Sequence, residues 1–244
     1  MKAMILAAGV GSRLGKYTVS KPKSLQDIGG QAILEHVLTR IKQVGVTEVV
    51  LNLHHFPEQI KSFLSDHNCF GLKCHFSLEE QLLDTGGGLF RCKDFFTEED
   101  FILHNSDIYS TFPLKEVFPA HTASGAVATL ICSDNKDHRK FLFDQDNNLC
   151  GWQNFTTGKK SVIAGREPSR ALGFAGIHLI APKIFSLYKP EKEIFSIIDT
   201  YLALAKEGYS VKPYEIADED YLDIGTPEDL EKLRDRLKGN REKE

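Results

Sequence analysis

The chain opens with the stretch Met4-Ile5-Leu6-Ala7-Ala8-Gly9-Val10-Gly11-Ser12-Arg13-Leu14. In it, an apolar and strand-like run ends abruptly in small residues and two glycines. Small residues at the carboxyl end of a first strand let the backbone approach a bound group closely, and Gly9 and Gly11 permit the turn that this approach requires. The stretch therefore predicts a strand followed by a ligand-binding turn.

Two basic residues give this turn a preference for anions. Arg13 lies within it, and Lys23 follows in Ser20-Lys21-Pro22-Lys23-Ser24-Leu25. Backbone amides in such a turn form a concave anion site, and the two side chains add fixed positive charge. We interpret the stretch as a phosphate-binding loop, with an ordinary glycine-rich turn as the alternative.

The loop matches neither of two well-known phosphate-binding fingerprints. A P-loop has the pattern G-x-x-x-x-G-K-[ST], and no lysine followed by a hydroxyl residue comes after the second glycine here. A dinucleotide-binding turn has the pattern G-x-G-x-x-G, but counting from Gly9 the third glycine position holds Leu14. The sequence therefore argues against both a kinase-type loop and an NAD site.

Composition limits the class of protein and its partners. The chain has 244 residues, of which 41% are hydrophobic and 26% are charged, as expected of a globular protein with one substantial core. We predict a single domain over residues 1–240 and a charged tail over residues 241–244. Because the net charge is −4, no global field attracts nucleic acid or an anionic membrane, and we expect neither as a partner.

Cysteine usage and the amino terminus predict a cytoplasmic protein. The cysteines are odd in number, scattered and without a C-x-x-C pair, which disfavours structural zinc and a disulfide framework. They are Cys69, Cys74, Cys92, Cys132 and Cys150. The residues before the loop are too few for a signal peptide, and no apolar run approaches the ~18 residues that cross a bilayer.

Hydrophobic periodicity after the loop predicts a parallel sheet. The spacing of apolar residues over Gln31–Val44 predicts a helix ended by Gly45. Glu48–Leu53 and Leu72–Phe76 have the composition of strands, and Pro57 begins a helix between them. Strands that alternate with helices pair in parallel through right-handed crossovers, and their ligands bind at the carboxyl ends of the strands.

Two later strand ends carry candidate ligand-binding residues. Glu79–Leu83 leads into Asp84–Leu89, where three glycines at a helix start permit close approach to a flat or anionic group, a flexible turn being the alternative. Phe101–His104 runs into Asn105–Tyr109, where Asp107 is a suitable oxygen ligand for Mg²⁺ or else a helix-capping or turn aspartate.

The remaining segments complete the expected fold. Residues 126–180 contain short strands that suggest a small mixed sheet, a plausible place for a second substrate. Ile194–Glu207 is predicted to be a helix, and Asp223 follows a short strand. A last helix is predicted to begin after the N-cap Thr226 and to stop at Gly239.

Taken together, these motifs resemble the sugar-1-phosphate nucleotidyltransferases. Their pattern is L-A-A-G-x-G-x-R-L, P-K-x-L, a glycine-rich helix start, N-x-D and D-x-G-T-P-E-D-L. The matching segments are Leu6–Leu14, Pro22–Leu25, Thr85–Gly88, Asn105–Asp107 and Asp223–Leu230. The resemblance implies an α/β fold, namely a Rossmann-like three-layer sandwich with a mostly parallel mixed central sheet and a small accessory β sheet.

The resemblance also implies roles for individual residues. Catalytic roles are implied for Arg13, Lys23, Asp107 and Asp223, with Asp107 and Asp223 sharing Mg²⁺. Nucleotide contacts are implied for Leu6, Ala7, Ala8, Gly9, Gly11, Ser12, Arg13, Lys23, Glu79, Thr85, Gly87 and Gly88, of which Glu79 would contact the base. Sugar contacts are implied for Asn105, Glu167 and Gly176.

The sequence departs from the family pattern at a few positions. Lys16 occupies the place of a proline that relatives carry before Thr18, which puts the stiffness of the loop in doubt, and Ser106 replaces a frequent glycine. The chain also has no room for the C-terminal β-helix of acetyltransferase-bearing relatives, so we expect no such second activity.

The implied activity is Mg²⁺-dependent transfer of a nucleotidyl group from a nucleoside triphosphate to a sugar 1-phosphate, with release of pyrophosphate. Within the family the motifs look most like bacterial enzymes that use UTP and N-acetylmuramate 1-phosphate. Mannose- and heptose-1-phosphate guanylyltransferases, which use GTP, look almost as similar. Glu79 leaves the base open, because a carboxylate can accept from uracil N3–H or from guanine N1–H and N2–H.

Alternative functions, the oligomeric state and the roles of two histidines complete the expectations from the sequence. The acceptor could instead be a phospho-alcohol, and the protein could be a catalytically silent sensor of sugar nucleotides. We expect a monomer or a small homo-oligomer. For His54 and His55, which follow a strand, we expect packing or hydrogen-bonding roles rather than metal ligation.

Overall fold

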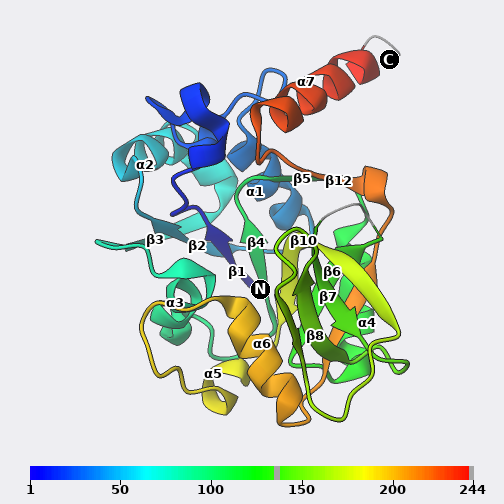
Figure 1. The fold of residues 1–244 in the computed structure, drawn as a ribbon. Helices are drawn as coiled ribbons and strands as arrows, with labels where there is room; N and C mark the ends of the chain where they lie inside the picture. The colour runs from blue at the N-terminus through cyan, green and yellow to red at the C-terminus, as the bar shows by residue number, and fades with distance from the viewer. Residues whose placement is uncertain (135–137, 242–244) are drawn as a thin grey trace. The chain divides into compact units, whose positions relative to one another are not determined.

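The computed structural model describes residues 1–134 and 138–241, with the side chains of residues 240 and 241 left out of the description (Figure 1). The chain divides into two compact units. The first comprises the described residues of Met1–Leu82, His104–Thr111 and Tyr221–Glu244, and the second those of Leu83–Leu103 and Phe112–Asp220.

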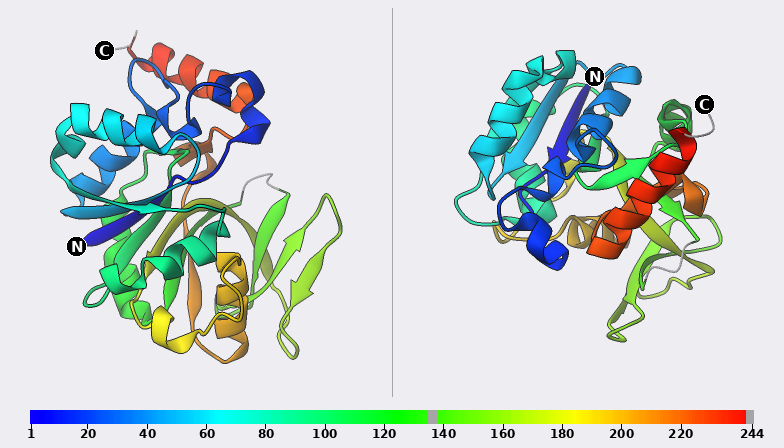
Figure 2. Two further views of the ribbon diagram at one scale, coloured as in Figure 1. Left: turned by 90° about the vertical axis from the view of Figure 1, so that its left-hand side faces the viewer. Right: turned by 90° about the horizontal axis from the view of Figure 1, so that it is seen from above.

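The first unit holds three parallel strands and the helices that connect them, seen from two further directions in Figure 2. Its strands are β1 (Lys2–Leu6), β2 (Glu48–Leu53), β3 (Lys73–Leu78), β5 (Ile108–Ser110) and β12 (Tyr221–Asp223). Its helices are η1 (Ser12–Thr18), η2 (Lys23–Leu25), α1 (Ile33–Gln43), α2 (Pro57–Asp66), η3 (Asn68–Gly71) and α7 (Pro227–Arg241). Strand β4 (Phe101–Asn105) begins in the second unit and ends in the first.

The predicted parallel pairing of the first strands is confirmed. Met4 lies opposite Val50, and Val50 lies opposite His75, so β1, β2 and β3 end at the same edge. The apolar stripe predicted for the first helix is buried along the whole of α1, and Gly45 follows it with a φ of 93°. This edge is where an α/β sheet binds its ligands.

The two ends of the chain share one hydrophobic core. It consists of Leu14, Ile28, Ile33, Tyr109, Ile224, Leu230 and Leu233. Residues from the opening loop, the β5 strand and α7 therefore exclude water together. This packing carries the segment around Asp223 to the opening loop.

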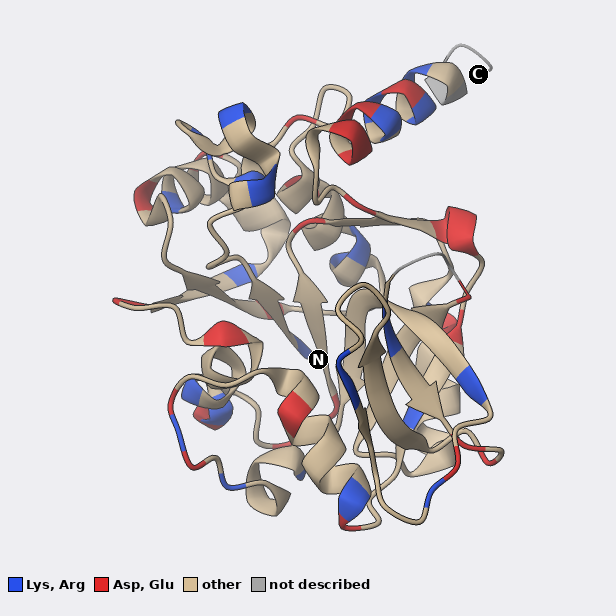
Figure 3. Ribbon diagram, in the orientation of Figure 1, with Lys and Arg blue, Asp and Glu red and all other residues tan. Residues whose placement is uncertain are grey.

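The predicted end of the last helix is wrong. Gly239 lies inside α7, which continues to Arg241, and Gly239 does not adopt the left-handed φ by which glycine ends helices. Arg241 of the predicted tail is therefore helical, and residues 242–244 lie outside the described residues. The exposed part of α7 carries charges of both signs along its length (Figure 3).

The second unit is built on a mixed sheet. Its strands are β6 (Ala128–Ser133), β7 (Arg139–Phe143), β8 (Leu149–Asn154), β9 (Lys160–Val162), β10 (Arg170–Ile180) and β11 (Val211–Glu215). Its helices are α3 (Asp84–Arg91), η4 (Lys93–Phe95), η5 (Leu114–Glu116), α4 (Val117–Ser124), α5 (Ile184–Leu187), α6 (Ile197–Lys206) and η6 (Asp218–Asp220). The pairs β10–β6, β10–β7, β7–β8 and β8–β9 are antiparallel, whereas β11 runs parallel to β6.

The strands predicted between residues 126 and 180 are thus confirmed, and so is the α/β class with its mixed sheet. One helix boundary is corrected: α6 begins at Ile197 rather than Ile194, because the Ser196 hydroxyl accepts from the Ile198 N–H at 3.3 Å and caps the helix. Among the described residues, no helix has the length and apolar character needed to cross a bilayer.

Candidate active site

A cavity of about 190 Å³ lies at the carboxyl edge of the first unit's strands, entirely within that unit. It is lined by Leu6, Ala7, Gly9, Gly11, Ser12, Arg13, Lys23, Ser24, Ser106, Asp107 and Gly225. The predicted phosphate loop and one of the two predicted metal ligands therefore face one space.

The loop is shaped by glycine and threonine together. Gly11 has a left-handed φ of 65°, and a Cβ there would lie 2.9 Å from Thr18 Cγ2 and 3.1 Å from Lys23 Cβ. The Thr18 hydroxyl donates to the carbonyl oxygen of Gly11 at 3.1 Å or of Gly15 at 3.2 Å. Gly11 is thus required both by its backbone conformation and by its close neighbours.

Gln26 anchors the rest of the loop, a role that the sequence analysis missed. The residue is 4% exposed, and its Nε2 donates to the carbonyl oxygen of Tyr17 at 2.8 Å and lies 3.4 Å from that of Pro22. Gln59 adds a second anchor, donating to the carbonyl oxygen of Ser20 at 3.0 Å. These bonds hold the segment that leads into Lys23. The only feature of the sequence that could have indicated this buried role is the position of the glutamine next to the apolar Leu25.

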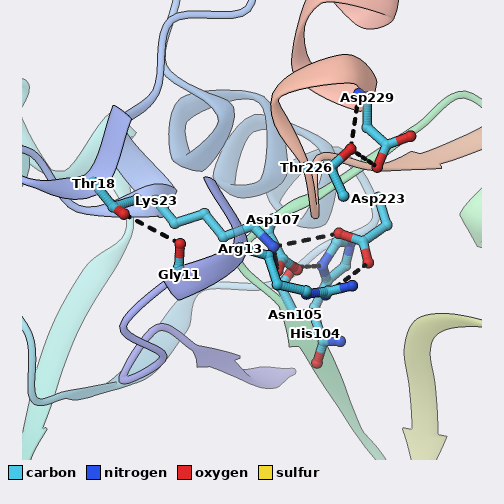
Figure 4. Close-up of polar contacts among 10 residues, drawn as sticks. All are labelled: Gly11, Arg13, Thr18, Lys23, His104, Asn105, Asp107, Asp223, Thr226 and Asp229. Atoms are coloured by element: carbon cyan, nitrogen blue, oxygen red, sulfur yellow. Dashed lines mark hydrogen bonds and ion pairs between the residues drawn. The ribbon is translucent and has the colours of Figure 1, made fainter. Parts of the chain in front are cut away.

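Lys23 joins two carboxylates that are distant in sequence (Figure 4). Its ammonium group forms a close ion pair with Asp107 and lies 3.4 Å from Asp223 Oδ1. The guanidinium of Arg13 approaches Asp223 Oδ2 at 4.0 Å. The two acids are held by the β5–β12 pairing, in which Asp223 lies opposite Ile108 and the Ile224 N–H donates to the Asp107 carbonyl at 3.1 Å.

The closeness of the Asp107 and Asp223 carboxylates affects the pKa of Asp223. Burial, and then the charge of Asp107, raise the pKa of Asp223 to about 6, against the opposing effects of Lys23 and Arg13. In addition, Asp107 Oδ1 is buried and has no hydrogen-bond partner among the described residues. Two adjacent carboxylates with an unsatisfied oxygen suit a hard divalent cation that takes its other ligands from phosphates and water. The residues present therefore fit Mg²⁺.

Gly225 and Thr226 complete the segment that bears Asp223. A Cβ at Gly225 would lie 3.0 Å from Arg13 Nη2, so glycine leaves the space that Arg13 occupies. The Thr226 hydroxyl accepts from the Asp229 N–H at 3.2 Å, which confirms its predicted capping of the last helix.

Glu79 lies at the end of β3 but does not line the cavity. It is 5% exposed, its N–H donates to the Leu53 carbonyl at 2.8 Å, and its Oε1 accepts from Asn52 Nδ2 at 2.8 Å. Its own carbonyl lies 2.8 Å from His54 Nδ1, and the Thr18 carbonyl lies 3.4 Å from His55 Nε2. Both histidines thus have the hydrogen-bonding roles expected of them.

Two other predicted residues, Ala8 and Asn105, lie close to the cavity in sequence but are not part of its lining. Ala8 is buried, at 5% exposure. Asn105 ends β4 half-buried, with its carbonyl oxygen 2.7 Å from His104 Nδ1. The next residue, Ser106, donates its N–H to the Leu6 carbonyl at 3.1 Å and so aligns the Asp107 segment with the start of the loop.

The glycine run of α3 belongs to the second unit and has a packing role there. The N–H groups of Gly86 and Gly87 donate to the Phe195 carbonyl at 3.0 and 3.1 Å, and a Cβ at Gly87 would lie 2.1 Å from the Glu193 carbonyl oxygen. The Thr85 hydroxyl accepts from the Ile197 N–H at 3.0 Å. These glycines are therefore required by a neighbouring segment, whatever ligand contacts Thr85, Gly87 and Gly88 make.

The remaining predicted sugar contacts also lie in the second unit. Glu167 is exposed in a loop, next to Arg166, whose Nη1 pairs with Asp144 Oδ2 at 3.3 Å. Gly176 has a φ of 72° within an irregularity of β10, between Phe174 and His178. Local backbone geometry accounts for this glycine, and the sugar-binding roles of both residues stay predictions.

Comparisons with known proteins identify the family of the chain. The model of the nucleotidyl transferase family matches residues 2–143. Mannose-1-phosphate guanylyltransferase 1 of Arabidopsis thaliana is 31% identical over 94% of this chain and 62% of its own length, and the mannose-1-phosphate guanyltransferase of Candida albicans is 28% identical over the same shares. The chain thus spans less than two thirds of these relatives.

A solved structure shows the same fold. HddC from Yersinia pseudotuberculosis superposes with a TM-score of 0.76 at 22% identity, covering 97% of this chain and 99% of that one. At this identity the likeness concerns the fold alone. The match of the family model over more than half of the sequence places the chain, by contrast, in a specific family. The protein is therefore a member of the nucleotidyl transferase family.

Proposed function

We propose that this chain transfers a nucleotidyl group from a nucleoside triphosphate to a sugar 1-phosphate and releases pyrophosphate. The observation that carries the proposal is the convergence of Lys23, Asp107 and Asp223 at the rim of a glycine-shaped loop. The named relatives favour GTP and mannose 1-phosphate over UTP and N-acetylmuramate 1-phosphate, the pair that the motifs had suggested first. We therefore take the guanylyltransferase as the specific proposal.

The chemistry required is an in-line displacement at the α-phosphorus. An oxygen of the sugar 1-phosphate attacks, the bond to the β-phosphate oxygen breaks, and pyrophosphate leaves. Because the attacking phosphate is already anionic, no general base is needed, and the barrier comes from charge repulsion and alignment. Residues that neutralise and orient phosphates should therefore dominate catalysis.

The loop residues suit this task. The loop amides and Arg13 would hold the triphosphate, while Lys23 would neutralise the α-phosphate or the incoming sugar phosphate. Asp107 and Asp223 would hold Mg²⁺. When bound, the ion would supply positive charge against the charge that builds up at phosphorus. Glu79 would accept hydrogen bonds from the base.

Pyrophosphate release measured with a panel of triphosphates and sugar 1-phosphates tests the proposal. We expect release with GTP and mannose 1-phosphate in the presence of Mg²⁺, and less with other pairs. Release with UTP and N-acetylmuramate 1-phosphate instead would restore the first interpretation of the motifs. Nucleotide binding without release for any pair, phospho-alcohols included, would point to a silent sensor.

A further inference from the structure

Asn52 connects the ends of three parallel strands through its side chain. It is the penultimate residue of β2 and is 3% exposed. Its Oδ1 accepts from the N–H of Ala7, just beyond β1, at 2.8 Å. Its Nδ2 donates to Oε1 of Glu79, just beyond β3, at 2.8 Å. One buried carboxamide thus joins the phosphate loop to the predicted base-contacting residue.

The chemistry of the three groups determines the direction of these bonds. A backbone N–H can only donate, so the atom of Asn52 that faces Ala7 must be the oxygen. The amide nitrogen of Asn52 must then face Glu79, and it can only donate. The Glu79 atom opposite it must therefore be an acceptor, as a carboxylate oxygen is.

Other bonds leave Glu79 little freedom to turn away. Its N–H is held by the Leu53 carbonyl at 2.8 Å, and its carbonyl is held by His54 at 2.8 Å. Glu79 is only 5% exposed, so few groups can reach its carboxyl group. Which ligand atoms it can bind therefore depends on how that carboxyl group is oriented. A buried acceptor that meets another acceptor is left without a hydrogen bond and weakens binding.

We propose that Asn52 is a positioning residue that sets Glu79 as a hydrogen-bond acceptor toward the nucleobase and thereby selects bases with a ring N–H. This inference rests on the proposed function, in which Glu79 contacts the base. Guanine and uracil present a ring N–H to such an acceptor. Adenine N1 and cytosine N3 are themselves acceptors, so they meet the carboxylate with an unpaired lone pair and are rejected.

A reversal of the hydrogen bond between positions 52 and 79 provides a decisive test. In E79Q, Asn52 still donates, so the new side chain turns its oxygen to Asn52 and its NH₂ toward the base, where it opposes the base N–H. In N52D, two carboxylates face each other and Glu79 is pushed out of place. In the double variant N52D/E79Q, the NH₂ of the new residue 79 donates to the new carboxylate at 52, and an oxygen again faces the base.

The measurement is equilibrium binding of GTP and of ATP by isothermal titration calorimetry, with the full chain and Mg²⁺. We expect each single variant to bind GTP roughly 5- to 100-fold more weakly, the range that corresponds to one unsatisfied buried group. We expect the double variant to recover to within about 5-fold of the wild type, and the preference for GTP over ATP to recover with it.

The matched control is T129V, which removes a buried hydrogen bond of the second unit, between Thr129 Oγ1 and His121 Nδ1 at 2.8 Å. It should lower the melting temperature without changing the GTP-to-ATP preference. If N52D does not fold, the comparison of GTP binding by E79Q and by the double variant still tests whether Asn52 orients Glu79. A double variant no better than E79Q, or an N52D protein with unchanged GTP preference, would overturn the inference.

The assay separates this inference from the proposed function. Wild-type protein that prefers GTP in binding but releases no pyrophosphate with any acceptor refutes the transferase, while the variants still test Asn52. If the wild-type protein releases pyrophosphate normally but the variants at positions 52 and 79 do not change nucleotide binding, only the role of Asn52 is refuted. Wild-type protein that binds no triphosphate refutes both.

Discussion

Lys23 and Asp107 form an ion pair although 84 positions separate them in the chain. The two side chains are 11% and 22% exposed, so water screens their charges less than it would at the surface. Since β5 also pairs with β12, the same ion pair lies next to Asp223. A cation-and-carboxylate cluster is thus assembled from three parts of the sequence.

Removal of the Lys23 charge should impair turnover strongly. K23M keeps much of the aliphatic stem but loses the ammonium group that, in the proposed function, would neutralise phosphate. Loss of a single preorganised electrostatic group costs about 10²–10³ in rate, and we expect a fall in kcat of that size in the pyrophosphate-release assay. The control is K21M, since Lys21 is an exposed lysine of the same segment. Equal activity of the two variants would contradict a role for Lys23.

The D223A substitution should abolish Mg²⁺-dependent turnover and leave the fold intact. Asp223 contributes one of the two carboxylates that fit the ion, and its removal also relieves repulsion with Asp107. Turnover should be measured against Mg²⁺ concentration, with circular dichroism as the check of folding. D218A, at an exposed acid in η6, serves as the control. Full activity of D223A would remove Asp223 from the site.

The Q26L substitution should test whether the loop needs its buried anchor. The variant has a similar volume but leaves the Tyr17 carbonyl without the donor that lies 2.8 Å away. We expect a loss of about 1–3 kcal/mol in the free energy of unfolding, and a larger proportional fall in kcat than in the Q43L control, where the glutamine is exposed on α1. If kcat is unchanged, then Gln26 does not position Lys23.

The G87A substitution should destabilise the protein through packing. Its Cβ would lie 2.1 Å from the backbone oxygen of Glu193, and overpacking of this kind costs about 1–3 kcal/mol. The control is G239A, because Gly239 lies in α7, where no described atom beyond its chain neighbours and the helix's own backbone lies within 4 Å of the added Cβ, and alanine there should stabilise the helix by up to about 1 kcal/mol. Urea denaturation measures both, and a stable G87A protein would refute the close contact.

Two buried histidines should lower the stability as the pH falls from 6.5 toward 4, and together they outweigh the opposite effect of Asp223, whose pKa is raised to about 6. Burial lowers the pKa of His104 to about 4, and burial likewise lowers that of His36 to about 4. At a pH between about 4 and the ordinary histidine pKa, these two histidines bind more protons in the unfolded chain than in the folded one. Lowering the pH through this range therefore favours unfolding. For His104, one unit of pKa is worth about 1.4 kcal/mol.

Urea denaturation at pH 6.5 and pH 5 measures this dependence. The loss between the two pH values should be smaller in H104N than in the wild type, because the variant lacks one of the buried imidazoles. H67N, at an exposed histidine, should keep the wild-type dependence. An H104N protein with the full pH dependence would show that His104 is not the group responsible.

Much of the fold could be predicted from the sequence because its signals are local. The glycine-ended strand, the apolar stripe of α1 and the Thr226 cap depend on residues within one or two turns of chain. Gly239 shows the limit of such signals. A glycine ends a helix only when it takes a left-handed φ, and the local pattern does not reveal which φ it takes.

The candidate site was predictable in its charged residues and not in the residues that hold them. The motifs predict phosphate and metal binding from the types of residue they contain, namely Arg13, Lys23, Asp107 and Asp223. Gln26 and Asn52 had no predicted role, because their partners are backbone and side-chain groups brought near only by folding. The glycines of α3 were interpreted as ligand-approach positions, whereas the contacts of Gly87 with the Glu193–Phe195 segment are visible only in three dimensions.

The sequence by itself therefore determined the order of strands and helices, the glycine-rich character of the opening loop and the identity of its charged groups. These follow from backbone propensities and side-chain chemistry, which act over short stretches of chain. The tertiary structure alone decided which acid lies beside Lys23 and which amide orients Glu79. Those relations depend on strand pairing and on a core shared by the two ends of the chain, because only folding can bring residues 200 positions apart within hydrogen-bonding distance.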